Sequence, residues 1–177
     1  MDCMTALANR YSYRGMYLPA PVPREHLVQI LEAGLAAPSG CNKQTTSLIA
    51  VDDPEILKTL GLYLKKPHFS SAPAAICVLT QRVAAYEDTC FAVQDYASAI
   101  ENMLLAITAM GYASCWVEGY VTGSWGIGRA MAQTLQVPPT HELVAYLPVG
   151  IPAEQKPRAQ RKPFESRAWF NGFQKTE

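Results

Sequence analysis

Apolar residues recur at two different spacings along the chain, and this alternation predicts helices and strands in turn. Leu27, Ile30 and Leu31 follow helical spacing between Pro23 and Pro38, whereas short apolar runs elsewhere have the length of strands. Residues 63–73, between the predicted helix 53–62 and the predicted strand 74–80, are expected to form a loop. The predicted helices cover residues 2–9, 23–37, 53–62, 91–110 and 124–135, and the predicted strands cover residues 47–51, 74–80, 113–117 and 143–149.

Local signals mark where several of these helices begin, and their order indicates the fold class. Asp2 and Ser124 are expected N-caps, and Pro54 after Asp53 suits a first helical turn. The segment 91–110 is apolar nearly all round, so we expect it to run through the centre of the core. Alternating helices and strands place the chain in the α/β or α+β class, and 177 residues suit one domain.

The charge of the chain is neutral overall but unevenly distributed. Fifteen basic residues balance fifteen acidic ones, which removes a general electrostatic reason to bind nucleic acid or an anionic membrane surface. Between Arg10 and Arg24 there are three arginines and no acid, and between Lys156 and Arg167 there are five basic residues and one acid. We expect these two stretches to meet at one anion; the alternative is two solvated faces.

Cysteine and histidine usage argues against a disulfide framework and a metal site. The five cysteines are an odd number without CxxC spacing, which favours a reducing cytoplasm. The three histidines are far apart in sequence, so no metal is expected. No signal peptide is recognisable, and the longest apolar segment, 96–113, contains Glu101 and is expected to be a buried helix rather than a membrane span.

Four polar patches are the candidates for chemistry. Arg10, Ser12 and Arg14 alternate, so in an extended segment they face one phosphate or ring edge. The stretch 158–165 is a second basic patch. Residues 37–44 and 117–120 form tight turns whose backbone allows close approach of a flat ligand. A phosphate at one end and a planar ring at the other describe flavin mononucleotide (FMN). The alternatives are that 10–14 is an exposed charged loop, that 38–42 is an ordinary helix-to-strand turn, and that Glu118 is a surface carboxylate.

These patches, taken in order, resemble those of the nitroreductase family of FMN-dependent oxidoreductases over nearly the whole chain. The stretch Arg10-Tyr-Ser-Tyr-Arg14 is similar to the family's Arg-Arg-Ser-x-Arg pattern. The segment 37–44 resembles its Ala-Pro-Ser-x-x-Asn-x-Gln, and Glu118-Gly119 its Glu-Gly turn. The closing Arg-Lys-Pro-Phe-Glu at 161–165 resembles its C-terminal motif, and helix 91–110 its buried dimer-interface helix.

The resemblance implies an α+β fold, an α/β/α sandwich with a mostly antiparallel sheet, and a homodimer in which residues 152–177 pack on the partner. Arg10 and Ser12 would hold the phosphate, and Arg161 would join them from the far end of the chain. Arg14 would lie at the pyrimidine edge, and the N–H of Glu118 or Gly119 would donate to flavin N5. The turn at Pro38 would reach the flavin of the opposite subunit. The residues implied in cofactor binding are Arg10, Tyr11, Ser12, Arg14, Pro38, Ser39, Gly40, Asn42, Val117, Glu118, Gly119, Arg158 and Arg161.

The implied activity is transfer of a hydride from NAD(P)H, through non-covalently bound FMN, to an oxidised acceptor such as a nitroaromatic or quinone. No catalytic side chain is expected, because the flavin does the chemistry. Two alternatives remain: a specialised member that performs dehalogenation, dehydrogenation or flavin breakdown, and a non-catalytic flavin carrier or sensor.

The sequence departs from the family pattern in three places. Gln44-Thr45-Thr46 replaces Gln-Pro-Trp, and Ala159 stands where a basic residue is common, so Arg158 or Lys156 is the expected substitute. The chain is also short, and only the loops 65–71 and 81–90 could cover the flavin. We therefore expect an open site.

Overall fold

The computed structural model describes residues 1–173, and its centre is a three-stranded antiparallel sheet in the order β1-β2-β3. The strands are β1 (Thr46–Val51), β2 (Ala74–Thr80) and β3 (Glu142–Val149). Leu48 lies opposite Val78, and Cys77 lies opposite Tyr146. Three of the four predicted strands are therefore confirmed to within one residue at each end.

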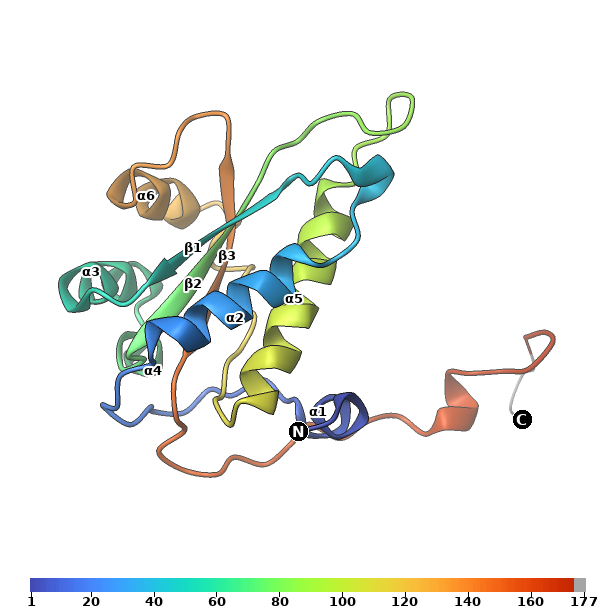
Figure 1. Cartoon of the computed structure of the whole chain (residues 1–177), viewed down its shortest axis with the longest axis horizontal. Coiled ribbons are helices and arrows are strands. Elements are labelled where there is room, and N and C mark those ends of the chain that lie inside the picture. Colours follow the sequence, from blue (N-terminus) through green and yellow to red (C-terminus); the bar gives the residue numbers. More distant parts are fainter. Residues whose placement is uncertain (174–177) are drawn as a thin grey trace.

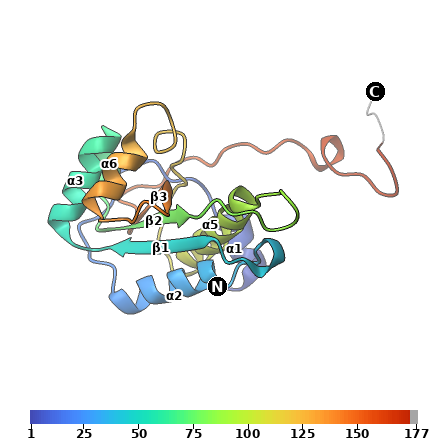
Figure 2. The ribbon, with the colours of Figure 1, turned by 90° about the horizontal axis from the view of Figure 1, so that it is seen from above.

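Helices cover both faces of this sheet (Figures 1 and 2), which confirms the α+β class. Two helices, α2 and α5, lie on one face, and α3 and α6 lie on the other. Each face has its own apolar core, one around Ile100 and Met103 of α5, the other around Leu60 of α3 and Met131 of α6. The helices are α1 (Cys3–Asn9), α2 (Arg24–Leu35), α3 (Pro54–Leu64), α4 (Pro67–Ser70), α5 (Ala92–Ala109) and α6 (Ile127–Thr134), with 3-10 turns η1 (Gly40–Asn42) and η2 (Phe164–Ser166).

The long helix α5 is buried on only one side of the single chain. Ile100, Met103 and Ile107 pack against the sheet and α2, whereas Leu105 and Ala109 on the other side are half-exposed. The expectation of a helix through the centre of the core is therefore met on one side only, because residues on the other side keep part of their surface exposed in the single chain.

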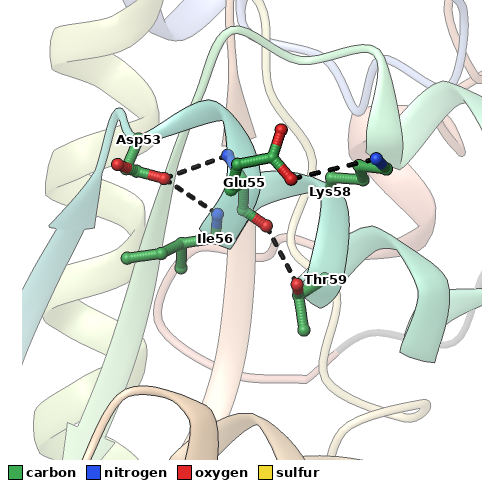
Figure 3. Close-up of polar contacts among 5 residues, drawn as sticks. All are labelled: Asp53, Glu55, Ile56, Lys58 and Thr59. Atoms are coloured by element: carbon green, nitrogen blue, oxygen red, sulfur yellow. Dashed lines mark hydrogen bonds and ion pairs between the residues drawn. The ribbon is translucent and has the colours of Figure 1, made fainter.

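Two N-caps follow the predicted signals. The Asp2 carboxylate accepts a hydrogen bond from the N–H of Thr5 at 3.0 Å. The Asp53 carboxylate accepts from the N–H groups of Glu55 at 2.9 Å and Ile56 at 3.0 Å (Figure 3), which satisfies donors that have no partner inside a helix.

Two boundary predictions are wrong. The segment 63–73 is not all loop, because α3 runs on to Leu64 and the one-turn helix α4 follows it. Helix α6 begins after Gly126 (φ 69°), not at Ser124. The chain before it is held in a non-helical turn, in which the N–H of Val121 donates to the carbonyl of Glu118 at 2.7 Å.

The predicted strand 113–117 is the third correction, since only its two ends form bridges, one to β3 and one to the residue after it. Ala113 bridges Gly150, and Val117 bridges Tyr146. This register places Cys115 opposite Pro148, whose nitrogen carries no hydrogen to donate. The ladder is interrupted there, although the segment still lies along the edge of the sheet.

The C-terminal segment leaves the body after Pro152 and projects away from it (Figures 1 and 2). Phe164, Phe170 and Phe173 are all more than half exposed along it. The predicted extension 152–177 ends outside the described residues at 174–177. No helix in the described part of the chain is both long and apolar enough to cross a membrane.

Candidate functional site

The two basic patches from opposite ends of the sequence line one cavity of about 830 Å³, here called the basic cavity. One wall comes from the end of α1 and the segment after it, and the other comes from the C-terminal segment. The lining residues are Leu7, Ala8, Arg10, Tyr11, Ser12, Arg14, Pro157, Arg158, Ala159 and Arg161. The expectation that the two basic stretches meet in space is therefore met.

Alternation in the N-terminal patch sets which side chains face the basic cavity. Ser12 and Arg14 are exposed, while Tyr13 between them is fully buried. The N–H of Tyr13 donates to the carbonyl of Ser114 at 2.8 Å, and this contact lays the patch beside the segment 113–117. Extended backbone and a buried tyrosine thus point the hydroxyl and the guanidinium to the same side.

Local contacts hold two of the four arginines of the basic cavity in place. The Arg10 Nε lies 3.2 Å from Glu101 Oε1 on α5. Arg158 donates to the Ala8 carbonyl at 3.0 Å and to Asn9 Oδ1 at 2.9 Å, and its guanidinium carbon lies 5.8 Å from the Tyr11 ring centroid. Arg158 therefore joins the C-terminal segment to the end of α1.

The charge of Arg14 also affects the pKa values of two nearby groups, His68 and Cys115. Burial first, then Lys66 and Arg14, hold the pKa of His68 below its usual value. Burial raises the pKa of Cys115 to about 11, although Arg14 opposes the rise. Near neutral pH His68 and Cys115 are therefore neutral, and the charges beside them are those of Arg14 and Lys66.

Residues 38–44, here called the strained turn, adopt an unusual backbone. Cys41, Asn42 and Gln44 all have positive φ, at 49°, 54° and 51°. Non-glycine residues rarely adopt this region, so the surrounding structure must hold them there. The Ser39 hydroxyl does so in part by accepting the N–H of Gln44 at 2.9 Å.

Glycine is required at position 40 because of the small space around it, not because of its own φ. The positive φ values fall on its neighbours, whereas a Cβ at Gly40 would lie 2.4 Å from Phe91 Cδ2 and 2.8 Å from Phe91 Cβ. Gly40 therefore allows the turn to approach the N-terminus of α5, rather than supplying the turn's dihedral angles.

Asp95 on α5 anchors the strained turn through two hydrogen bonds. One carboxylate oxygen accepts the N–H of Gly40 at 2.8 Å, and the other accepts the hydroxyl of Thr45 at 2.6 Å. Asp95 is 4% exposed, so these bonds lie out of water. Thr45, one of the departures from the family pattern, has a direct structural role here.

The Glu118-Gly119 turn presents its backbone rather than its carboxylate. The Tyr96 hydroxyl donates to Glu118 Oε1 at 2.7 Å and turns that side chain toward α5. Burial, and then this bond to Glu118, raise the pKa of Tyr96 to about 12. Within the described residues, the N–H groups of Glu118 and Gly119 donate no hydrogen bond. Two backbone donors are thus available to a ligand.

The basic cavity and the strained turn do not meet within one chain. The strained turn lies at the N-terminal end of α5, and α1 lies toward its other end (Figure 1). None of the residues lining the basic cavity comes from the turn. The structure therefore brings the first and last predicted patches together and leaves Pro38, Ser39, Gly40 and Asn42 apart from them.

Three residues that orient this site were not among the predicted ones: Asp95, Tyr96 and Glu101. All three lie on α5, each bound to a different patch. Polar residues inside an otherwise apolar helix were the available signal. Among residues 1–173, no cluster of three His, Cys, Asp or Glu side chains is suited to a metal ion.

Comparison with known proteins points to one family. Residues 7–67 and 61–151 match the model of the Nitroreductase family. A protein of Archaeoglobus fulgidus named NADH dehydrogenase/NAD(P)H nitroreductase is 28% identical over 156 residues, which is 88% of each chain. The FMN reductase [NAD(P)H] of Bacillus subtilis is 28% identical, over 93% of this chain and 72% of that one.

Solved structures agree with the sequence comparison. An FMN-dependent nitroreductase from Clostridium difficile R20291 superposes with a TM-score of 0.81 at 26% identity, over 96% of this chain and 99% of that one. A Bacteroides thetaiotaomicron protein, described as a NADH dehydrogenase/NAD(P)H nitroreductase, gives a TM-score of 0.83 at 23% identity, over 97% and 98% of the two chains. At that identity the second likeness shows the fold alone.

Proposed function

Because the chain belongs to the nitroreductase family, we propose that it is an FMN-dependent oxidoreductase that uses NAD(P)H to reduce a nitroaromatic or quinone acceptor. The names of its relatives support FMN and NAD(P)H as the partners of the reaction. The free thiols support a reducing, cytoplasmic location.

The observation that carries the proposal is the position of the basic cavity relative to the free N–H groups. Ser12 pairs with Ser114, and four residues further along the same edge segment lie the unpaired donors of Glu118 and Gly119. An extended segment of four residues spans about 13 Å. One edge of the sheet thus offers cations at one end and backbone donors at the other, which fits a phosphate joined by a chain to a flat ring.

The residues of the basic cavity would hold the phosphate. Ser12 offers a hydroxyl, and Arg10, Arg158 and Arg161 offer guanidinium groups that bind phosphate with paired hydrogen bonds. Arg158 would take the place of the basic residue that is common at the position of Ala159. The hydrogen bond from Arg158 to Asn9, the residue before Arg10, holds Arg158 in this position within the single chain.

The side chains of the site would orient the ring rather than exchange protons with the substrate. When bound, FMN supplies the two-electron chemistry between NAD(P)H and the acceptor. Arg14 would supply a cation beside the part of the ring that becomes negatively charged on reduction. The N–H of Glu118 or Gly119 would donate to ring nitrogen N5, and the Tyr96 hydroxyl holds the Glu118 carboxylate toward α5.

The second half of each site would come from a partner copy in a homodimer. The strained turn has the hydrogen-bonding groups expected at the ring, yet lies apart from the basic cavity of its own chain. The outer side of α5 and the exposed phenylalanines of the C-terminal segment are apolar surfaces that a second copy would cover.

The deciding experiment is a visible absorption spectrum of the purified protein, followed by anaerobic addition of NADH or NADPH. A flavin spectrum that bleaches on addition supports the proposal. A flavin that does not bleach favours a carrier or sensor, and a protein that takes up no FMN contradicts the proposal.

Arg14→Ala should weaken FMN binding or lower the flavin reduction potential. Unchanged values of both the affinity and the potential would remove Arg14 from the site.

A further inference from the structure

The loop after Gly119 carries two aromatic side chains for which the proposed flavin site has no use. The rings of Tyr120 and Trp125 lie 5.6 Å apart between centroids, with their planes inclined at 40°. Trp125 is 69% exposed and Tyr120 is 36% exposed. Two large rings in contact, one of them mostly in solvent, form a single aromatic surface beside the free N–H groups.

The backbone holds this surface in a fixed position. The N–H groups of Val121 and Thr122 donate to the Glu118 carbonyl at 2.7 and 2.8 Å, and the N–H of Gly128 donates to the Val121 carbonyl at 3.0 Å. Val121, which lies between Tyr120 and Trp125 in the sequence, is buried and anchors the loop to the core. A Cβ at Gly123 would lie 2.7 Å from the Gly119 carbonyl oxygen, so the loop closes tightly on the Glu118-Gly119 turn.

The chemistry of the loop selects the kind of ligand. No residue from Gly119 to Gly126 carries a charged side chain. The faces of indole and phenol rings are electron-rich and favour offset stacking with electron-poor rings. An uncharged loop with such faces suits a flat, neutral, electron-poor ring.

We propose that Tyr120 and Trp125 form a binding platform for an uncharged, planar, electron-poor aromatic acceptor of the nitroarene type. The proposal rests on the function proposed above, because the platform lies next to the backbone donors assigned to the flavin ring. The platform positions the acceptor and takes no part in electron transfer, so its loss affects binding of one class of acceptor.

The first test is tryptophan fluorescence of the FMN-loaded and flavin-free protein during titration with para-dinitrobenzene. The chain has three tryptophans, and Trp116 and Trp169 are both less exposed than Trp125. Saturable quenching is expected in the wild type, and most of its amplitude should vanish in Trp125→Phe. Quenching that never saturates, or that is equal in the variant, overturns the platform.

The second test separates the acceptor from the donor in steady-state kinetics. Trp125→Ala should raise KM for para-dinitrobenzene about five- to tenfold, with KM for ferricyanide and NAD(P)H unchanged. Leu62→Ala is the control, because Leu62 on α3 is also 69% exposed. Equal rises for both acceptors, or a rise for NAD(P)H alone, overturn the assignment. Failure to bind FMN contradicts the proposed function, whereas the titration of flavin-free protein still decides the platform.

Discussion

The basic cavity and the strained turn are built by opposite means. The cavity is lined by charged side chains, of which Arg14 and Arg161 are exposed, on backbone without positive φ values. The turn carries little charge but holds three positive φ values over buried Asp95. A cavity of charges can lose a member without affecting the fold, whereas a strained backbone depends on its anchor. Changes in the turn should therefore affect stability, and changes in the cavity should affect ligand affinity.

The largest expected effect is that of Asp95→Ala. The change leaves the N–H of Gly40 and the hydroxyl of Thr45 without their acceptor in a buried position. Hydrogen bonds to charged groups contribute ~1.5–3 kcal/mol each, so the free energy of unfolding should fall by about 3 kcal/mol. Urea denaturation measures it.

The matched control for Asp95→Ala is Glu101→Ala, which removes the other anchoring carboxylate of α5. Glu101 pairs with Arg10 of the basic cavity, and its side chain is 41% exposed. Pairs in solvent contribute less than ~1 kcal/mol, so this variant should keep nearly all its stability. Equal losses in the two variants would end the distinction between the two regions.

A smaller effect is expected from Gly40→Ala. The new Cβ meets Phe91 at both Cδ2 and Cβ, so the turn or the start of α5 must shift. Overpacking of this kind costs about 1–3 kcal/mol of unfolding free energy, measurable by thermal or urea denaturation. Gly119→Ala is the comparison, since nothing lies within 4 Å of its Cβ position. A Gly40→Ala protein as stable as Gly119→Ala would show that the turn tolerates displacement.

The smallest effect on stability is expected from Arg161→Ala, together with a clear effect on binding. Arg161 is exposed and lines the basic cavity, so the free energy of unfolding should change by less than ~0.5 kcal/mol. The Kd for FMN should rise about tenfold at low salt, and less at high salt, because salt screens exposed charges. Flavin fluorescence titrations at two salt concentrations measure it. Loss of stability without loss of affinity would reverse the roles of the two regions.

Part of the fold follows from local signals. The runs 74–80 and 143–149 are strands because they are apolar and of strand length, and Asp2 and Asp53 cap helices through contacts within three residues. The broken ladder at 113–117 could not be predicted in this way. It depends on Pro148 lying opposite Cys115, and that register exists only once the sheet is formed.

The sequence by itself determined the chemistry of the site: alternating arginines and a serine, a glycine turn after an apolar run, and a basic C-terminal stretch. Each is a pattern of neighbours, and side-chain direction in extended chain follows from spacing alone. The tertiary structure decided which patches meet and what each residue is for. Gly40 is needed because of Phe91, and the turn is held by Asp95, both distant in sequence. Packing on α5 also separates the strained turn from the basic cavity, because contacts across the core are set by how elements pack and not by spacing within them.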